Sequence, residues 1–251
     1  MLTKAAQAAD AARAVLLHYF GRVRQVDRKV NQSLVSVADI ESEQAIKKYL
    51  NDGSVGFLAE ESGVDGPVDR CWIIDPLDGT TNYLHGLPFF AVSIGLEVKN
   101  EMMVGLVDLP LLQTRYWAIK GQGAFRDGVP IHVSSRPSLS EGLLATGFST
   151  SELIDTEIQL RAVEKVIQRT RGVRRVGSAA IDLCWVAEGL WDGFWEKHLQ
   201  PWDTAAGSLI VREAGGCMTN YSGDNFKCRH TSVVASNGLI HGELLKLLGL
   251  S

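Results

Sequence analysis

One stretch of the chain reads Trp72-Ile73-Ile74-Asp75-Pro76-Leu77-Asp78-Gly79-Thr80-Thr81-Asn82. It opens on a short apolar run rich in β-forming residues, which predicts a buried strand over residues 71–74. Pro76 has no N–H to donate to a neighbouring strand, so we expect the strand to end near Asp75. Asp75 and Asp78 would then stand close together where the chain leaves the sheet.

The residues after the second carboxylate favour a turn into a helix. Gly79 permits a sharp turn or a close backbone approach, and Thr80, Thr81 and Asn82 are good helix N-caps. Free amides at a helix start suit an anion, and carboxylates suit hard divalent cations. The stretch therefore predicts a site for such cations and a phosphate; the plainer alternative is an Asx-rich loop after a strand.

The same stretch resembles the Asp-Pro-Ile/Leu-Asp-Gly-Thr signature of the inositol monophosphatase family, lithium-sensitive and magnesium-dependent phosphatases. Two further segments agree with it. Residues 58–62, Leu-Ala-Glu-Glu-Ser, are similar to the family's Gly-Glu-Glu-Ser, with Ala59 replacing the usual glycine. Residues 201–207, Pro-Trp-Asp-Thr-Ala-Ala-Gly, resemble its second signature, Trp-Asp-x-Ala-Ala-Gly. The three segments occur in the family's order, and the likeness extends over nearly the whole chain.

Composition is that of an ordinary soluble globular protein, with 45% hydrophobic and 22% charged residues among 251. A net charge of −4 gives no global attraction for nucleic acid, so we expect none as a partner. The four cysteines show no C-x-x-C spacing, which argues against zinc and favours reduced cytosolic thiols. Asp10 and Arg13 interrupt the first apolar segment, and no apolar run approaches the ~20 residues that cross a bilayer. We therefore expect a cytoplasmic protein that does not enter a membrane.

The periodicity of the first part of the chain predicts two helices and then an antiparallel meander. The helices are expected over residues 2–20 and from Ser36 to about residue 50, the second with Asp39 as capping partner. Small residues on one face of the strand over 90–98 would let a helix pack closely. The strands are expected at residues 55–58, 71–74, 90–98, 102–107, 115–119, 124–126 and 130–133.

After a connection at residues 134–142, strands and helices alternate, which predicts a layered α/β arrangement. The resemblance implies a five-layer αβαβα sandwich of the sugar-phosphatase type. We expect residues 1–140 to form an α+β half that carries Glu60 and the metal motif at 75–80. Residues 141–251 would form an α/β half that carries Glu196 and Asp203, and both halves would make one compact catalytic unit. The strands are expected at 143–146, 172–176, 191–196 and 232–235, and the helices at 154–169, 178–187, 203–214 and 238–249.

Glu60, Asp75, Asp78 and Asp203 each stand where a strand ends or a helix begins, the usual place for a site in layered α/β proteins. Four carboxylates gathered without a cation would repel one another and raise their pKa values. Divalent ions relieve that repulsion, and an all-oxygen ligand set with no nearby His favours Mg²⁺ over zinc.

Carried over position by position, the resemblance implies one Mg²⁺ held by Glu60, Asp75 and the carbonyl of Leu77. A second would be held by Asp75, Asp78 and Asp203, and a third, weaker ion would lie beside Glu60. Thr80, with Glu60 as its acceptor, is expected to position the attacking water. The N–H groups of Gly79 and Thr80 would hold phosphate oxygens during in-line attack, so the expected catalytic residues are Glu60, Asp75 and Thr80.

The resemblance also implies contacts to the substrate. Gly177 and Ala179 belong to the family's sugar-side segment, although Ser178 between them is equally an ordinary helix N-cap. Glu196 has the family's spacing before Asp203 for the carboxylate that accepts hydrogen bonds from inositol hydroxyls; its alternative is a solvated glutamate. Asp78, Gly79, Thr80 and Asp203 are expected to contact substrate as well.

Two features stand apart from this pattern. The family's usual Asp-Leu-Val-Thr-x-x-Asp appears as Ser-Leu-Val-Ser-Val-Ala-Asp at residues 33–39. Because Ser33 replaces a carboxylate and the loop after Lys29 is shortened, the case for the third ion is weaker. One basic run comprises Arg169, Arg171, Arg174 and Arg175. It is either a patch that binds an anion or nucleic acid or, as we favour, a helix C-terminus whose positive charges complement the helix dipole.

The function expected is hydrolysis of myo-inositol monophosphate. The alternatives within the family are fructose 1,6-bisphosphatase, 3′-phosphoadenosine 5′-phosphate phosphatase and histidinol-phosphate phosphatase. A rival of another class is a regulatory binding protein, since bacterial members that resemble this chain are associated with the transcription machinery. The family commonly forms homodimers, for which residues 90–98 or the first helices are candidate interfaces.

Overall fold

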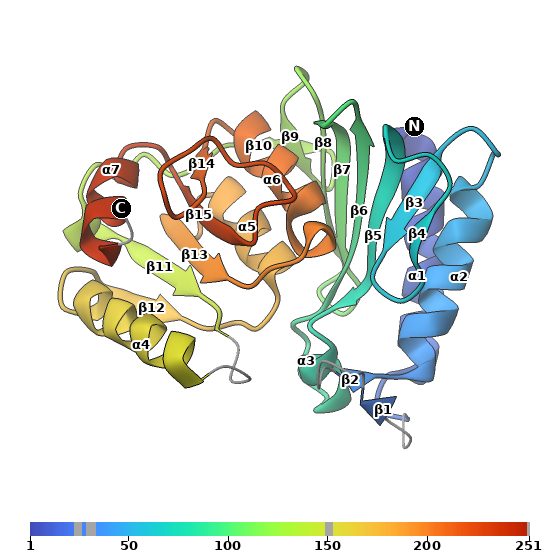
Figure 1. Ribbon diagram of the computed structural model, residues 1–251, viewed down its shortest axis with the longest axis horizontal. Coiled ribbons are helices and arrows are strands. Elements are labelled where there is room, and N and C mark those ends of the chain that lie inside the picture. Colours follow the sequence, from blue (N-terminus) through green and yellow to red (C-terminus); the bar gives the residue numbers. More distant parts are fainter. Residues whose placement is uncertain (23–26, 29–33, 149–152, 250–251) are drawn as a thin grey trace.

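The computed structural model describes residues 1–22, 27–28, 34–148 and 153–249 (Figure 1). The chain forms five layers, in the order helices, sheet, helices, sheet, helices. This arrangement confirms the expected αβαβα sandwich. In the described ranges, no helix is long and apolar enough to cross a membrane.

The first layer is the pair of helices α1 (Leu2–Tyr19) and α2 (Val37–Leu50), which lie against one face of the larger sheet (Figure 1). Ser36 and Asp39 form the predicted capping box at the start of α2. Small buried side chains on α1 let it pack closely on α2 and the sheet. They are Ala5, Ala8, Ala9 and Ala12.

The larger sheet has eight strands in the order β10-β9-β8-β7-β6-β5-β3-β4. All neighbours are antiparallel except β3 and β5, so the predicted meander is confirmed. The strands are β3 (Gly56–Ala59), β4 (Gly63–Asp65), β5 (Arg70–Asp78), β6 (Ala91–Val98), β7 (Glu101–Leu109), β8 (Thr114–Ile119), β9 (Ala124–Arg126) and β10 (Val129–Ile131). A separate antiparallel pair, β1 (Asp27–Arg28) and β2 (Leu34–Val35), lies outside both larger sheets.

Strand β5 was predicted to end near Asp75, and this prediction is wrong. The strand continues through Pro76 to Asp78. The pairing with β6 shifts between Asp75, which lies opposite Ser93, and Asp78, which lies opposite Ala91. The irregularity frees Pro76 from the hydrogen-bond ladder, so its missing N–H costs no pairing. The bend places both carboxylates at one end of the strand.

Helices α5 (Ala179–Ala187) and α6 (Pro201–Glu213) form the middle layer (Figure 1). A Cβ atom on Gly95 would lie 3.1 Å from the Cβ of Ala205, and one on Gly105 would lie 2.6 Å from the carbonyl of Ala206. Gly95 on β6 and Gly105 on β7 therefore both admit α6 closely, and the close helix packing predicted for the small-residue face of β6 is confirmed. Because apolar clusters cover both faces of β6, this strand is already buried within the chain and offers no surface for a dimer.

The smaller sheet has the order β12-β11-β13-β15-β14, and α4 (Leu153–Ile167) and α7 (His241–Leu248) cover its outer face (Figure 1). Strand β14 was not predicted, and α7 begins later than predicted, at His241. The 3₁₀ turn Leu139–Glu141 lies in the connection between the sheets. The strands are β11 (Leu143–Thr146), β12 (Gly172–Arg174), β13 (Gly193–Lys197), β14 (Cys217–Thr219) and β15 (Ser232–Ser236). The division into halves at residue 140 stays a prediction.

Candidate active site

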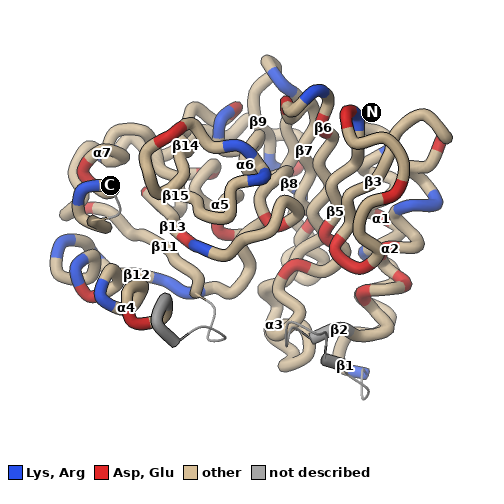
Figure 2. The backbone as a smooth tube through the Cα atoms, viewed as in Figure 1, with Lys and Arg blue, Asp and Glu red and all other residues tan. Residues whose placement is uncertain are grey.

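The predicted carboxylates come from three neighbouring strand and helix ends. Asp75 and Asp78 lie at the end of β5. Glu60 directly follows the parallel neighbour β3, and its N–H donates a 3.1 Å hydrogen bond to the carbonyl of Ile74. Asp203 lies in the first turn of α6. Figure 2 shows acidic positions near the end of β5, where the chain passes to α3.

Asp75 is the most enclosed of the four, with a residue exposure of 1%. Its Oδ1 accepts a 2.9 Å hydrogen bond from the N–H of Leu77. Burial, and then the negative charges of Glu60, Asp78 and Asp203, raise its pKa well above the usual range. The four carboxylates therefore lie within electrostatic reach of one another, as the sequence predicts.

Asp78 is held by the second half of the chain. Its Oδ2 accepts a 2.6 Å hydrogen bond from the hydroxyl of Ser178 and a 2.7 Å bond from the N–H of Ala180. Burial raises the pKa of Asp78 to about 6 although these hydrogen bonds act to lower it. Ser178 also caps α5, since its hydroxyl accepts from Ile181, so the N-cap interpretation is confirmed alongside this second contact.

Two glycine turns face each other beside Asp78. Gly79 has a φ of 89° and is the N-cap of the short helix α3 (Thr80–Leu84). A Cβ at Gly79 would lie 2.8 Å from the carbonyl of Phe89 and 3.3 Å from that of Gly177. Gly177 also has positive φ, at 86°. Only glycine fits both the conformation and the close approach at Gly79.

Asp203 shares a reciprocal capping box with Gln200, whose N–H donates to it at 2.7 Å. Burial, and then the charge of Asp78, raise the pKa of Asp203 well above its usual range. The helix begins at Pro201, two residues earlier than predicted, because proline suits the first helical position.

Comparison with known proteins agrees with this geometry. The family model described as "Inositol monophosphatase family" matches residues 1–249. The chain belongs to the inositol monophosphatase family. This family consists of metal-dependent phosphatases, and the resemblance first seen in the three motifs is confirmed.

Individual relatives cover nearly the whole chain. It is 41% identical to the inositol-1-monophosphatase of Synechocystis over 97% of this chain and 87% of that protein. It is 39% identical to the fructose-1,6-bisphosphatase/inositol-1-monophosphatase of Aquifex aeolicus, over 96% of this chain and 92% of that one. The crystal structure of the extragenic suppressor protein suhB from Bartonella henselae superimposes with a TM-score of 0.93 at 39% identity, covering 98% and 97% of the two chains.

The remaining predicted residues of this inositol monophosphatase family member fall at the same site or beside it. The hydroxyl of Thr80 lies 3.1 Å from the carbonyl of Leu77 and 3.3 Å from Oδ1 of Asp39, which is itself buried. Its pairing with Glu60 stays a prediction. Lys29 and Ser33 lie outside the described residues.

Glu196 lies on β13, and burial followed by the charge of Asp78 raises its pKa to about 8. Of the two charged residues beside it, Asp182 was not predicted, and Arg175 was predicted only as part of the basic run. Asp182 is buried on α5, receives a 3.1 Å hydrogen bond from Trp191, and has its pKa raised by burial and then by Glu196. Its position in the apolar run Ala179–Ala187 was the available signal. Arg175, which acts electrostatically on both acids, follows β12 rather than ending a helix, so our interpretation of the basic run is wrong for it and for Arg174.

The donor set fits a hard divalent cation. In the part of the chain that the structure describes, Asp75, Asp78 and Asp203 form no ion pair with a Lys or Arg. Their side chains are oxygen donors, as Mg²⁺ prefers. Among the same described residues, no three His, Cys, Asp or Glu side chains lie close enough together to bind one metal ion directly.

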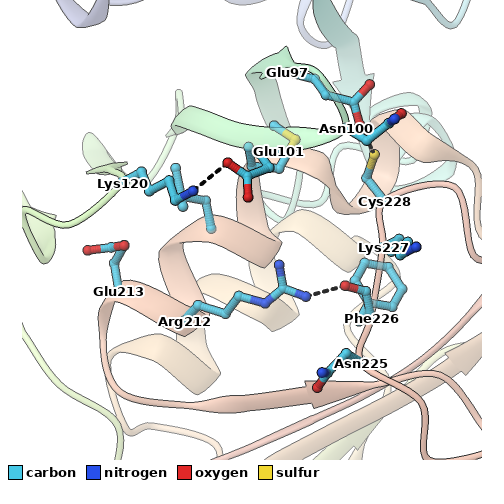
Figure 3. Close-up of a pocket in the computed structure, with 12 residues that line it drawn as sticks. Glu97, Asn100, Glu101, Lys120, Arg212, Glu213, Asn225, Phe226, Lys227 and Cys228 are labelled. Carbon is cyan, nitrogen blue, oxygen red and sulfur yellow. Dashed lines mark hydrogen bonds and ion pairs between the residues drawn. The ribbon is translucent and has the colours of Figure 1, made fainter.

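A separate cavity of about 420 Å³ lies at the other end of α6 (Figure 3). Arg212 and Glu213 line it, whereas Asp203 stands in the first turn of the same helix. Glu97, buried on β6, accepts hydrogen bonds there from Cys228 and, at 2.7 Å, from Arg229. Because none of the predicted site residues lines it, we assign it no part in the active site.

Proposed function

We propose that the chain is a cytoplasmic, Mg²⁺-dependent and Li⁺-inhibited phosphomonoesterase that hydrolyses myo-inositol monophosphate to inositol and phosphate. The observation that carries this proposal is the set of carboxylates at Glu60, Asp75, Asp78 and Asp203. They gather from the ends of β3 and β5 and from the start of α6, and the other three, together with burial, raise the pKa of Asp75. Names of relatives that include inositol-1-monophosphatase support the substrate class.

Glu60, Asp75 and the carbonyl of Leu77 would hold one Mg²⁺, and Asp75, Asp78 and Asp203 a second. A third, weaker ion would lie beside Glu60. Bound Mg²⁺ neutralises phosphate oxygens, lowers the pKa of bound water and stabilises the leaving oxygen. The donor set described above is the support for this assignment.

The protein groups position the reactants. Thr80 and Glu60 would orient the attacking water, and the N–H groups of Gly79 and Thr80 would bind phosphate oxygens. Glu196 would accept hydrogen bonds from the polyol hydroxyls, beside Asp78, Asp203, Gly177 and Ala179. Gly79 is the N-cap of α3, so its N–H and that of Thr80 lie at a helix start, where amides without a helical acceptor suit an anion.

Turnover on a panel of esters tests the substrate. The panel is inositol 1-phosphate, fructose 1,6-bisphosphate, 3′-phosphoadenosine 5′-phosphate and histidinol phosphate, each with saturating Mg²⁺. We expect inositol 1-phosphate to be hydrolysed with a high kcat/KM. If it came last of the four, the active site would stand but the substrate would be wrong.

A second candidate is a binding function in the transcription machinery, alongside catalysis. Its support is a relative from Neisseria meningitidis, 38% identical over 98% of this chain, that is named a putative Nus factor SuhB. Purified bacterial RNA polymerase should then be retained by the immobilised chain and equally by its Asp75→Asn variant. No retention by either protein would end this candidate.

A homodimer is also proposed. Its support is a group of exposed apolar side chains on the two first helices. They are Leu17, Val37, Ile40 and Tyr49, with exposures of 42–51%. Sedimentation velocity at micromolar concentration should give the mass of two chains, and a single monomer peak would contradict it.

A further inference from the structure

Two buried polar side chains on α2 reach the segments that carry the ligands proposed for the first Mg²⁺. Ser42 is fully buried, and Glu43 beside it is 3% exposed. The helix that carries them packs against β5 (Figure 1). Burying a hydroxyl or a carboxylate costs free energy unless the group is hydrogen-bonded, so the partners of these two side chains indicate what they do.

Ser42 holds the irregular end of β5. Its hydroxyl donates a 3.0 Å hydrogen bond to the carbonyl of Pro76, which is buried. The register between β5 and β6 passes from Asp75 directly to Asp78, so Pro76 lies in the stretch where the pairing shifts. Ser42 therefore supplies a donor to this carbonyl from a different layer of the fold.

The peptide unit that Ser42 holds continues to Asp75. The carbonyl of Pro76 and the N–H of Leu77 belong to one planar peptide unit. That N–H donates to Oδ1 of Asp75 at 2.9 Å. One end of the peptide unit is thus held by Ser42, while the other end orients the carboxylate. Through this backbone Ser42 acts on two proposed ligands, the side chain of Asp75 and the carbonyl of Leu77.

Glu43 holds the turn that contains Glu60. Its Oε2 accepts a 2.8 Å hydrogen bond from the N–H of Glu61. On the other side, the N–H of Glu60 donates to the carbonyl of Ile74 at 3.1 Å. The backbone is therefore held by β5 before the side chain of Glu60 and by α2 after it. Glu43 and Glu60 also line one cavity of about 520 Å³.

We infer that Ser42 and Glu43 are positioning residues for the first Mg²⁺, which set the spacing between Glu60 and the segment from Asp75 to Leu77. The inference rests on the proposed function and adds two residues to it. Because the two side chains are neighbours on one helix, they tie the end of β5 and the turn after β3 to a single rigid element. Partners that orient metal ligands typically change metal affinity about 10–100-fold when they are removed.

Binding of Mn²⁺ tests the role of Ser42 without any substrate. Mn²⁺ prefers the same oxygen donors as Mg²⁺, and its free-ion paramagnetic resonance signal is lost on binding. Ser42→Ala should raise the Kd of the tightest-bound Mn²⁺ about tenfold. The matched control Ser236→Ala removes another buried hydroxyl, which contacts His241 at 2.9 Å, and should leave this Kd unchanged. Thermal unfolding without metal ions verifies that both variants are folded at the temperature of the titration.

Two substitutions separate the hydrogen bond of Glu43 from its charge. Glu43→Gln keeps an oxygen that can accept from the N–H of Glu61, whereas Glu43→Leu has none. The Kd of Mn²⁺ should stay within about threefold of the wild type in Glu43→Gln and rise about tenfold in Glu43→Leu. Equal weakening in both would show that the charge matters rather than the hydrogen bond, which would overturn the positioning role of Glu43. This pair also tests the inference if Ser42→Ala does not fold.

Turnover separates failure of the inference from failure of the proposed function. In Ser42→Ala and Glu43→Leu, the Mg²⁺ concentration for half-maximal rate should rise about tenfold, with the KM for inositol 1-phosphate unchanged. Unchanged Mn²⁺ affinity in both variants would overturn the inference, whatever ester the protein hydrolyses. Weakened Mn²⁺ binding in a protein that does not hydrolyse inositol 1-phosphate would support the inference and overturn the proposed substrate. A wild type that binds no Mn²⁺ would overturn both.

Discussion

The hydroxyl of Ser178 donates a 2.6 Å hydrogen bond to the carboxylate of Asp78, which lies 100 positions earlier in the chain. Asp78 ends β5 of the larger sheet, and Ser178 begins α5 in the layer between the sheets. The contact therefore fixes one carboxylate of the candidate site from the helical layer between the sheets. Ala180 adds a backbone N–H to the same oxygen.

Ser178→Ala should lower kcat/KM on inositol 1-phosphate by about tenfold, because a hydrogen bond to a charged group contributes roughly 1.5–3 kcal/mol. The bond from Ala180 should keep Asp78 near its place. The exposed control Ser140→Ala should leave kcat/KM unchanged. Thermal unfolding measured on both variants separates misplacement of Asp78 from lost stability; wild-type activity in Ser178→Ala would contradict the role of this contact.

Gly79→Ala should destabilise the protein more than Gly86→Ala. Both glycines have positive φ, which costs an alanine roughly 1–2 kcal/mol. Only Gly79 adds a steric clash, since a Cβ added there would lie 2.8 Å from the carbonyl oxygen of Phe89. A Cβ added at Gly86 would have no atom within 4 Å. The difference between the free energies of unfolding of the two variants, measured in urea, isolates the cost of the clash at Gly79. Equal losses of stability in both variants would show that there is no such clash.

Arg229→Gln should destabilise the fold by about 2 kcal/mol, because it leaves Glu97, which is 2% exposed, without its charged partner. Lys120→Gln is the control within the same cavity (Figure 3). Its ion pair with Glu101 is solvent-exposed and should matter little. Urea midpoints for both variants test the difference, and a neutral Arg229→Gln would mean that Glu97 is satisfied by Cys228 alone.

His241 should make stability fall in mild acid. Its ring contacts the hydroxyls of Thr219 at 3.0 Å and Ser236 at 2.9 Å, and burial lowers its pKa. In the unfolded chain His241 takes up a proton near pH 6.5, whereas in the folded chain protonation requires a lower pH. The unfolded state therefore binds more protons below pH 6.5, so the free energy of unfolding falls as the pH drops below that value.

In His241→Gln, the loss of urea stability between pH 7.5 and pH 5.5 should be smaller than in the wild type. His132→Gln, an exposed histidine, should keep the wild-type loss. The same pH dependence in all three proteins would show that other groups govern it.

The sequence predicts best what neighbouring residues determine. The capping box of Ser36 and Asp39, the turn at Gly79 and the carboxylate positions are local patterns, and the structure shows the acids in electrostatic contact. The bend of β5 at Pro76 escaped prediction because it depends on the register with β6. Arg175 was misjudged for a similar reason, since only the tertiary fold brings this residue of the basic run within electrostatic reach of Glu196.

The most direct test of the proposed metal-dependent phosphatase is phosphate release from inositol 1-phosphate as Mg²⁺ is titrated, with and without Li⁺. It should be run on the wild type and on Asp75→Asn. We predict turnover that requires Mg²⁺, is blocked by Li⁺, and falls by at least about a hundredfold in the variant. Turnover that is independent of Mg²⁺, or that survives in Asp75→Asn, would contradict the proposed site.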